Sequence, residues 1–110
     1  LEGSNLPLKR IAIKPDTDAC WHLYTVLIDF EKAEKDRAEV MNALSERGVG
    51  TQVHYIPLHL QPYYRRRYGD QSLPGAEHYY ERCLSLPLFP AMETDDINLV
   101  MESLHTVLGG

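Results

Sequence analysis

The segment Trp21–Phe30, WHLYTVLIDF, places the strongest constraint on what this chain can fold into. It is rich in aromatic and β-branched residues, which favour strands, and it has few polar residues for a solvated surface. We therefore predict a buried strand here. A chain of 110 residues fits one domain, and at this length somewhat over ~60% of the unfolded surface becomes buried. One core built on this strand is expected.

A helix over residues 36–47 has signals at both ends. Asp36 and Glu39 match a capping box at the start, and apolar residues follow at helical spacing. Gly48 stands where a helix ends in the left-handed conformation.

A second helix occupies the C-terminal end. Thr94 is the expected N-cap, acidic residues in the first turn favour the helix dipole, and Gly109 ends the helix. The apolar residues of this helix recur at its period: Ile97, Val100, Met101, Leu104 and Leu108.

The remaining elements are weaker and complete an alternating order of strands and helices. Short strands are predicted at Arg10–Ile13, Val49–Tyr55 and Leu84–Pro90, the last at a sheet edge because of its prolines. Helices are predicted at His59–Tyr68, and from Pro74 onward with Ala76, Tyr80 and Cys83 on one face. This order predicts an α+β fold: a small, mostly antiparallel sheet with helices packed on one face.

Charge and cysteine content exclude several classes of function. The net charge of −5, from 11 basic and 16 acidic residues, does not favour a nucleic-acid partner. Cys20 and Cys83 form no C-x-x-C motif and no disulfide framework, so we expect a cytoplasmic protein. No apolar run approaches the roughly 18 residues of a membrane span, and no secretory signal opens the sequence, so we expect no membrane partner.

The segment Gly48–Gly69, GVGTQVHYIPLHLQPYYRRRYG, gathers ring-bearing and cationic side chains. His54 and His59 lack nearby Cys, Asp or Glu residues to complete a tetrahedral set, so we expect no metal. Two interpretations remain open for each histidine: a partly buried ring bound to backbone groups, or a polar contact to an anionic ligand.

The tyrosines and arginines of this segment allow a second pair of interpretations. Tyrosines stack on bases and arginines bind phosphates, as in RNA recognition. In an acidic chain, however, the run Arg65–Arg67 is more typical of a solvated helix face. At least one of Tyr63, Tyr64 and Tyr68 is expected to face inward near the histidines.

The other histidines carry less information. If Trp21 faces the core, strand alternation places His22 on the opposite surface, either as an exposed residue or as a site residue. His78 and His105 fall in core-facing helix patterns that imply no site.

No catalytic motif is present. The sequence has no G-x-S-x-G, no phosphate-binding glycine loop and no Cys–His pair. Its lysines stand in polar contexts, whereas a Schiff-base lysine needs a desolvated pocket. We expect no catalysis by this chain alone.

Three blocks nevertheless resemble a known family: WHLYTVLID, DRAEVMNALSERGVGTQVHYIPLHLQPYYRRRYG and LPGAEHYYERCLSLPLFPAMETDDINLVMESL. They are similar to the C-terminal small domain of the DegT/DnrJ/EryC1/StrS family, the pyridoxal-phosphate-dependent sugar-nucleotide aminotransferases of fold type I. The resemblance covers about residues 15–108. The sequence GTQVHYIPLHLQPYY most resembles the corresponding block of enzymes that aminate UDP-linked 4-keto-6-deoxy-HexNAc sugars, including the aminotransferase of the pseudaminic acid pathway.

The resemblance implies a longer parent enzyme. Its N-terminal domain holds pyridoxal phosphate on a lysine, and the small domain helps to close the substrate cleft in a homodimer. The cofactor accepts an amino group from glutamate and passes it to the ketosugar. Residues 1–14 are interpreted as a lead-in or linker, partly a cloning remnant, and residues 15–110 as the small domain without its N-terminal partner. The fragment alone is expected to bind no cofactor.

The resemblance also suggests a site. His54, Tyr55 and His59, with Tyr63 or Tyr64, are expected at the rim of the sugar-nucleotide cleft. Arg65 is expected to approach the diphosphate, and His22 matches a polar position of the family's strand block. Two alternatives stay open: a free-standing nucleotide- or carbohydrate-binding module, and a structural domain for dimer packing.

Overall fold

A three-stranded antiparallel sheet, in the order β1-β2-β3, forms the centre of the fold. The computed structural model describes residues 1 and 3–109. Its elements are β1 (Leu8–Arg10), β2 (Tyr24–Ile28), α1 (Arg37–Glu46), the 3₁₀ helix η1 (Leu58–Leu60), α2 (Pro62–Tyr68), α3 (Pro74–Arg82), β3 (Cys83–Leu86) and α4 (Thr94–Leu108).

The central strand β2 confirms the strand predicted within Trp21–Phe30. Val26 lies opposite Leu84 of β3, and Thr25 lies opposite Ser85. Because side chains alternate along a strand, these two pairs point to opposite faces. One face is therefore apolar, and the other carries two hydroxyl groups.

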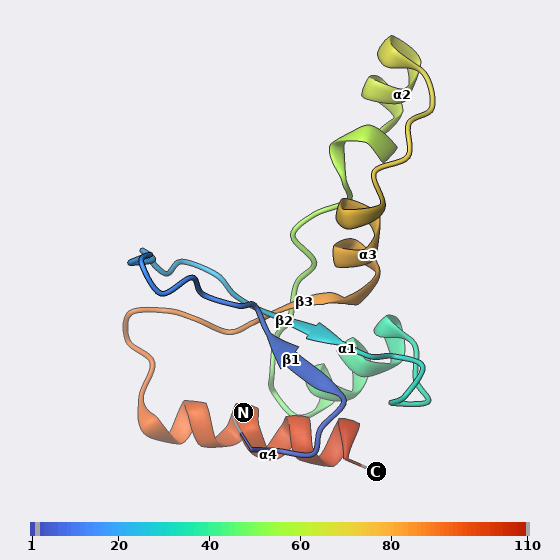
Figure 1. The fold of residues 1–110 in the computed structure, drawn as a ribbon. Coiled ribbons are helices and arrows are strands. Elements are labelled where there is room, and N and C mark those ends of the chain that lie inside the picture. Colours follow the sequence, from blue (N-terminus) through green and yellow to red (C-terminus); the bar gives the residue numbers. More distant parts are fainter. Residues whose placement is uncertain (2, 110) are drawn as a thin grey trace.

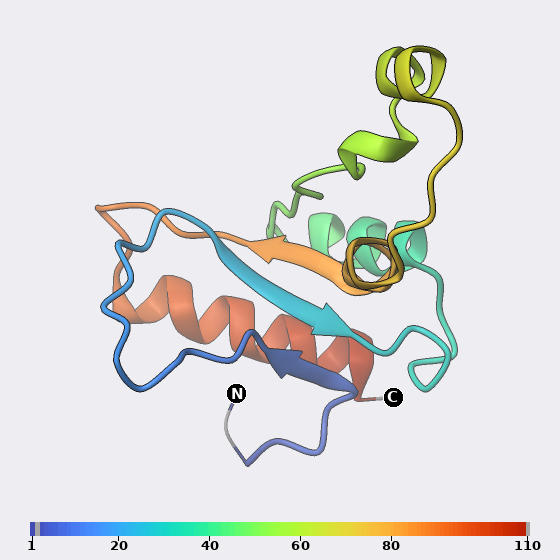
Figure 2. The same cartoon turned by 45° about the horizontal axis from the view of Figure 1, so that its top comes forward.

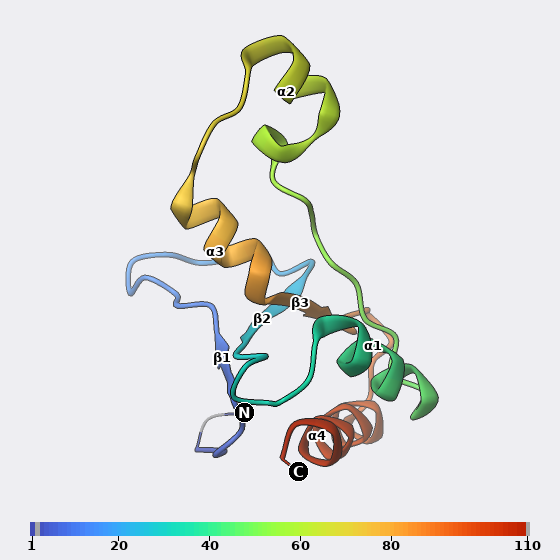
Figure 3. The ribbon, with the colours of Figure 1, turned by 90° about the vertical axis from the view of Figure 1, so that its right-hand side faces the viewer.

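Helices α1 and α4 cover the apolar face and close the core. Figure 2 shows α4 running behind the strands, and Figure 3 shows α1 beside it on the same side of the sheet. The predicted α+β fold, with helices packed on one face of a small antiparallel sheet, is confirmed. The most deeply buried apolar side chains come from β2, β3, α1 and α4: Val26, Ile28, Val40, Leu44, Leu84 and Leu104.

The ends of α1 agree with the sequence signals. The Asp36 carboxylate accepts the Glu39 backbone N–H at 2.8 Å, and the Glu39 carboxylate accepts the Asp36 N–H at 2.7 Å. At the other end, Gly48 has φ +81, and its N–H donates to the carbonyl of Ser45. Val49 donates to the carbonyl of Leu44, which completes a Schellman motif.

Two other boundaries differ from the prediction. Glu93, not Thr94, is the N-cap of α4, and it forms a reciprocal capping box with Asp96. The first strand covers Leu8–Arg10 rather than Arg10–Ile13, because pairing Leu8 with Ile28 places the leucine against the core.

The strand predicted at Val49–Tyr55 is wrong. Only Gln52 of this segment pairs with the sheet, through two backbone hydrogen bonds to Ser85 at 2.8 and 3.1 Å. The segment lies at the edge of β3, which begins directly after α3 and is four residues long. Alternate residues of a strand face the same edge, and the next such residue after Ser85 is Pro87, which has no N–H to continue a ladder.

An arm, residues 56–73, projects from the sheet and carries η1 and α2 (Figure 1). The single helix predicted over His59–Tyr68 is split because Gln61 has extended backbone angles before Pro62, which occupies the first turn of α2. The arm contributes to a radius of gyration of 15.6 Å, compared with about 13 Å for a compact domain of this length.

Helix α3 returns the chain from the arm to the sheet. Pro74 begins it, as predicted. The predicted face of Ala76, Tyr80 and Cys83 is wrong, because Ala76 is exposed and Cys83 has extended angles that start β3. Pairing of Cys83 with Leu27 ends the helix there.

In the described part of the chain, no helix is long and apolar enough to cross a bilayer.

Candidate functional site

A pocket of about 210 Å³ lies on the arm. It brings together one of the two histidines of the segment Gly48–Gly69, two tyrosines of the same segment, and apolar side chains from both ends of the arm. Its lining includes Leu58, His59, Tyr64, Tyr68, Gln71 and Leu73.

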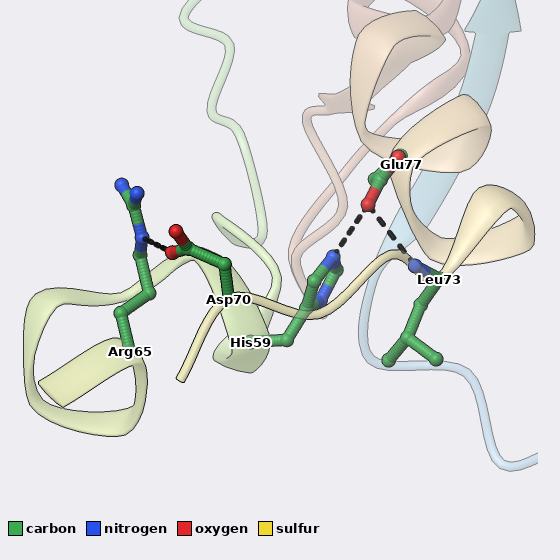
Figure 4. Close-up of polar contacts among 5 residues, drawn as sticks. All are labelled: His59, Arg65, Asp70, Leu73 and Glu77. Carbon is green, nitrogen blue, oxygen red and sulfur yellow. Dashed lines mark hydrogen bonds and ion pairs between the residues drawn. The ribbon is translucent and has the colours of Figure 1, made fainter. Parts of the chain in front are cut away.

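His59 is a buried residue of the arm and is bound to α3. Its Nε2 lies 2.8 Å from Oε1 of Glu77, in the first turns of α3 (Figure 4). The same oxygen accepts the backbone N–H of Leu73 at 3.1 Å. The hydrogen bond from His59, followed by that from Leu73, holds the pKa of Glu77 below its usual value of 4.5. The contact therefore favours an ionised carboxylate.

The tyrosines of α2 differ in exposure. Tyr64 is half-buried and lines the pocket, whereas Tyr63 and Tyr68 are more than half exposed. The ring of Tyr64 meets that of Tyr63 edge-on at 5.1 Å and lies nearly parallel to that of Tyr68 at 6.4 Å. The inward tyrosine expected from the sequence is Tyr64.

The arginines of α2 lie on its outer surface. Arg65 donates to Asp70 at 2.9 Å in an exposed ion pair (Figure 4). Arg67 donates to the hydroxyl groups of Tyr68 and Tyr63 at 3.1 and 3.4 Å. None of the three arginines, Arg66 included, is among the residues that line the pocket.

His54 lies on the irregular segment beside β3. Its Nδ1 is 2.8 Å from Oγ of Ser85, which is 3.3 Å from Oγ1 of Thr25 on β2. The adjacent Tyr55 is 70% exposed, and its ring meets that of His54 edge-on. The structure thus places His54 against the hydroxyl-bearing face of the sheet and His59 in the arm pocket.

His22 stands apart from both groups. It is exposed in the segment before β2. The condition that Trp21 faces the core is not met: Trp21 is 53% exposed and its ring lies 6.2 Å from that of Tyr24. Strand pairing begins only at Tyr24, so alternation cannot orient residues 21 and 22.

Sequence reasoning missed Glu77. An acidic residue in the first turns of a helix was visible as a pattern, and it is typical of an interaction with the helix dipole. Its partner His59 lies 18 residues earlier in the chain, across the arm, and no local spacing connects the two.

The residues of this chain do not fit pyridoxal phosphate. The cofactor needs a lysine in a desolvated pocket. Of the chain's four lysines, Lys9, Lys14 and Lys32 are exposed and Lys35 is half-buried. In residues 1 and 3–109, no three His, Cys, Asp or Glu side chains are grouped to hold a metal ion.

Comparisons with known proteins agree with this fold. Residues 4–105 match the DegT/DnrJ/EryC1/StrS aminotransferase family. The spore coat polysaccharide biosynthesis protein SpsC of Bacillus subtilis is 41% identical over 101 residues, which are 89% of this chain and 26% of that protein.

Similar solved structures include two aminotransferases. The aminotransferase TlmJ from Streptoalloteichus hindustanus has a TM-score of 0.76 at 31% identity, over 91% of this chain and 26% of its own. Helicobacter pylori PseC, an aminotransferase involved in the biosynthesis of pseudoaminic acid, has a TM-score of 0.73 at 24% identity, over 80% of this chain and 24% of its own.

The chain spans about a quarter of the length of each of these proteins. The family match covers nearly all of the chain itself. The chain belongs to the DegT/DnrJ/EryC1/StrS aminotransferase family.

Proposed function

We propose that this chain is the C-terminal small domain of an aminotransferase that acts on a nucleotide-linked sugar. The amino group comes from glutamate, and the acceptor is the 4-keto carbon of a UDP-linked 4-keto-6-deoxy sugar. Family membership and the resemblance to a polysaccharide biosynthesis protein support an aminotransferase of sugar metabolism. The glutamate donor rests on the family resemblance, and the acceptor and the nucleotide rest on the sequence block around His54 and His59.

The cofactor belongs to the rest of the parent enzyme. Pyridoxal phosphate, held there on a lysine, would carry the amino group between donor and acceptor. The four lysines of this chain lie at or near its surface, which supports a division of labour in which this domain supplies binding and the missing N-terminal domain supplies chemistry. The isolated chain is accordingly inactive, and the parent works as a homodimer.

The arm pocket carries this proposal. It combines a buried histidine with a half-buried tyrosine on a segment that projects away from the sheet (Figure 1). Rigid ring side chains bind hydroxyl-rich ligands with little loss of side-chain entropy. A projecting segment of this kind is suited to form one wall of a cleft whose other wall is a neighbouring domain.

The residues expected from the sequence take different roles in this proposal. His59 and Tyr64 form the pocket, and His54 and Tyr55 form the rim nearer the sheet. Tyr63 and Arg65 lie on the outer surface of the arm, where Arg65 would have to exchange Asp70 for a diphosphate. His22 would act only through a contact with the missing domain.

The test uses the full-length parent enzyme with His54→Ala and His59→Ala. The Michaelis constant for the sugar nucleotide is expected to rise by about tenfold, because a lost hydrogen bond to a ligand costs roughly 1 kcal/mol or somewhat more. His105→Ala, an exposed position on α4, is the control. Unchanged Michaelis constants in both variants would reject the site.

The acceptor is tested separately. The full-length enzyme, loaded with pyridoxal phosphate and supplied with glutamate, is offered UDP-linked 4-keto-6-deoxy sugars and sugars with the keto group at carbon 3. The expected result is amination of the 4-keto sugars. Amination of only the 3-keto sugars would overturn the assignment of the acceptor. It would still support the proposed aminotransferase activity.

A further inference from the structure

We propose that Glu77 is a positioning residue for the arm pocket. It holds the ring of His59 so that Nε2 points to α3 and Nδ1 faces the pocket as a hydrogen-bond acceptor. The group that Nδ1 binds is an O–H or N–H of an uncharged ring of the substrate, the sugar or the base, and not its diphosphate. This inference rests on the proposed function for the identity of the ligand, but the control of the ring by Glu77 does not.

The first argument is that one oxygen joins three parts of the chain. Oε1 of Glu77 accepts from Nε2 of His59 at 2.8 Å and from the Leu73 N–H at 3.1 Å (Figure 4). His59 lies near the beginning of the arm and Leu73 at its end, while Glu77 is on α3. The carboxylate therefore fixes both ends of the arm on one helix, and with them two residues that line the pocket.

The second argument concerns the tautomer of His59. An ionised carboxylate only accepts hydrogen bonds, so Nε2 must carry the proton that is donated. In a neutral ring the other nitrogen, Nδ1, is then an acceptor. Among the described residues, no buried side-chain nitrogen or oxygen lacks a hydrogen-bond partner, and the hydrogen bond of the His59 ring is made by Nε2. Nδ1, which makes no such bond, is therefore not fully enclosed, and we assign it to the pocket that His59 lines.

The third argument concerns the class of ligand. The side chains that share the pocket with His59 are uncharged, and none of the three arginines of α2 lines it. Arg65 is bound to Asp70, and Arg67 is bound to tyrosine hydroxyl groups. A phosphate has no cation in the pocket, whereas a ring with an apolar face packs on tyrosine and donates one hydrogen bond to Nδ1.

The experiment compares Glu77→Ala, Glu77→Gln and the control Glu81→Gln, one turn later on α3 and exposed. Histidine labelled with ¹⁵N in the full-length protein reports the tautomer, with the His59 signals assigned by their loss in His59→Asn. We expect the Nε2–H form in the unaltered protein and in Glu81→Gln, and a mixture of both tautomers in Glu77→Ala. Glu77→Gln is expected to be intermediate, because its amide oxygen still accepts.

A kinetic measurement separates positioning from a merely structural role. In Glu77→Ala the Michaelis constant for the sugar nucleotide should rise about five- to tenfold, the equivalent of one hydrogen bond, while kcat changes less than about twofold. Glu77→Gln should recover part of the loss. A variant that only loosens the fold would instead lower the melting temperature and the active fraction without this rescue.

The outcomes distinguish the two proposals. An Nδ1–H tautomer in the unaltered protein, or a Glu77→Ala protein with unchanged tautomer and unchanged Michaelis constant, overturns the positioning role. Tautomer control by Glu77 in a protein that aminates no sugar nucleotide supports that role and overturns the proposed function. Free pyrophosphate serves as an inhibitor that carries no ring. If Glu77→Ala weakens its inhibition by the same factor as it raises the Michaelis constant for the sugar nucleotide, the assignment of Nδ1 to an uncharged ring is overturned.

Discussion

The ring of His54 is held against the sheet by Ser85, whose hydroxyl oxygen lies 2.8 Å from Nδ1 of the histidine. Ser85 is also the residue to which Gln52 pairs through the backbone. One residue of β3 thus positions a segment that forms no strand of its own, and it does so from a site that is only 4% exposed.

Ser85→Ala should therefore loosen this segment. Loss of the hydroxyl removes one hydrogen bond from a half-buried histidine and should lower the free energy of unfolding by about 1 kcal/mol. Urea denaturation of the variant measures this change. Ser45→Ala on the exposed side of α1 is the matched control and should stay within about 0.5 kcal/mol of the unaltered protein. Equal stability of both variants would mean that water replaces Ser85 at His54.

The elements that the sequence predicts well are those with local signals. The capping box of Asp36 and Glu39, the glycine at Gly48 and the aromatic and β-branched content of Trp21–Phe30 all act within a few residues, and the structure reproduces the helix ends and a strand within that segment. The same is true of Pro74, which begins a helix because the first turn needs no proline N–H.

What the sequence does not predict depends on distant partners. The alternation of Val49–Tyr55 predicts a strand, but only Gln52 of this segment pairs with β3, at Ser85. The arm pocket likewise depends on the contact of His59 with Glu77, which lies 18 residues later in the chain, beyond α2. Of the expected site residues, His59 and Tyr64 share the pocket, whereas the substrate roles of all of them stay predictions.

The core should be sensitive to substitutions on the inward face of α4. Leu104 is fully buried and Leu99, on the same helix, is 42% exposed. Leu104→Ala should lower the free energy of unfolding by about 2–5 kcal/mol, because the removed methyl groups leave a cavity. Leu99→Ala should cost much less in the isolated chain. A larger loss in Leu99→Ala would mean that this side chain is covered, for example by a second copy, which sedimentation would detect.

The two cysteines should react at very different rates. Burial raises the pKa of the Cys83 thiol, which is 1% exposed, whereas Cys20 is exposed. The thiolate is the reactive form, so Cys83 is both hidden and protonated near neutral pH. Alkylation of the folded chain followed by peptide mass spectrometry should find Cys20 modified and Cys83 protected, with both modified in denaturant. Comparable modification of Cys83 in the folded chain would show that α3 and β3 separate readily.

Acidification should release the arm through Glu77. The folded pKa of Glu77 lies below 4.5 because the carboxylate accepts hydrogen bonds from His59 and Leu73. A lowered carboxyl pKa stabilises the folded state fully above the unfolded value, and this contribution is lost as pH falls through the folded value. The amide chemical shift of Leu73, followed from neutral to strongly acidic pH, should therefore change with a midpoint below 4.5. Glu77→Gln should abolish the transition, and a Leu73 shift that titrates identically in this variant would assign the pH dependence to another group.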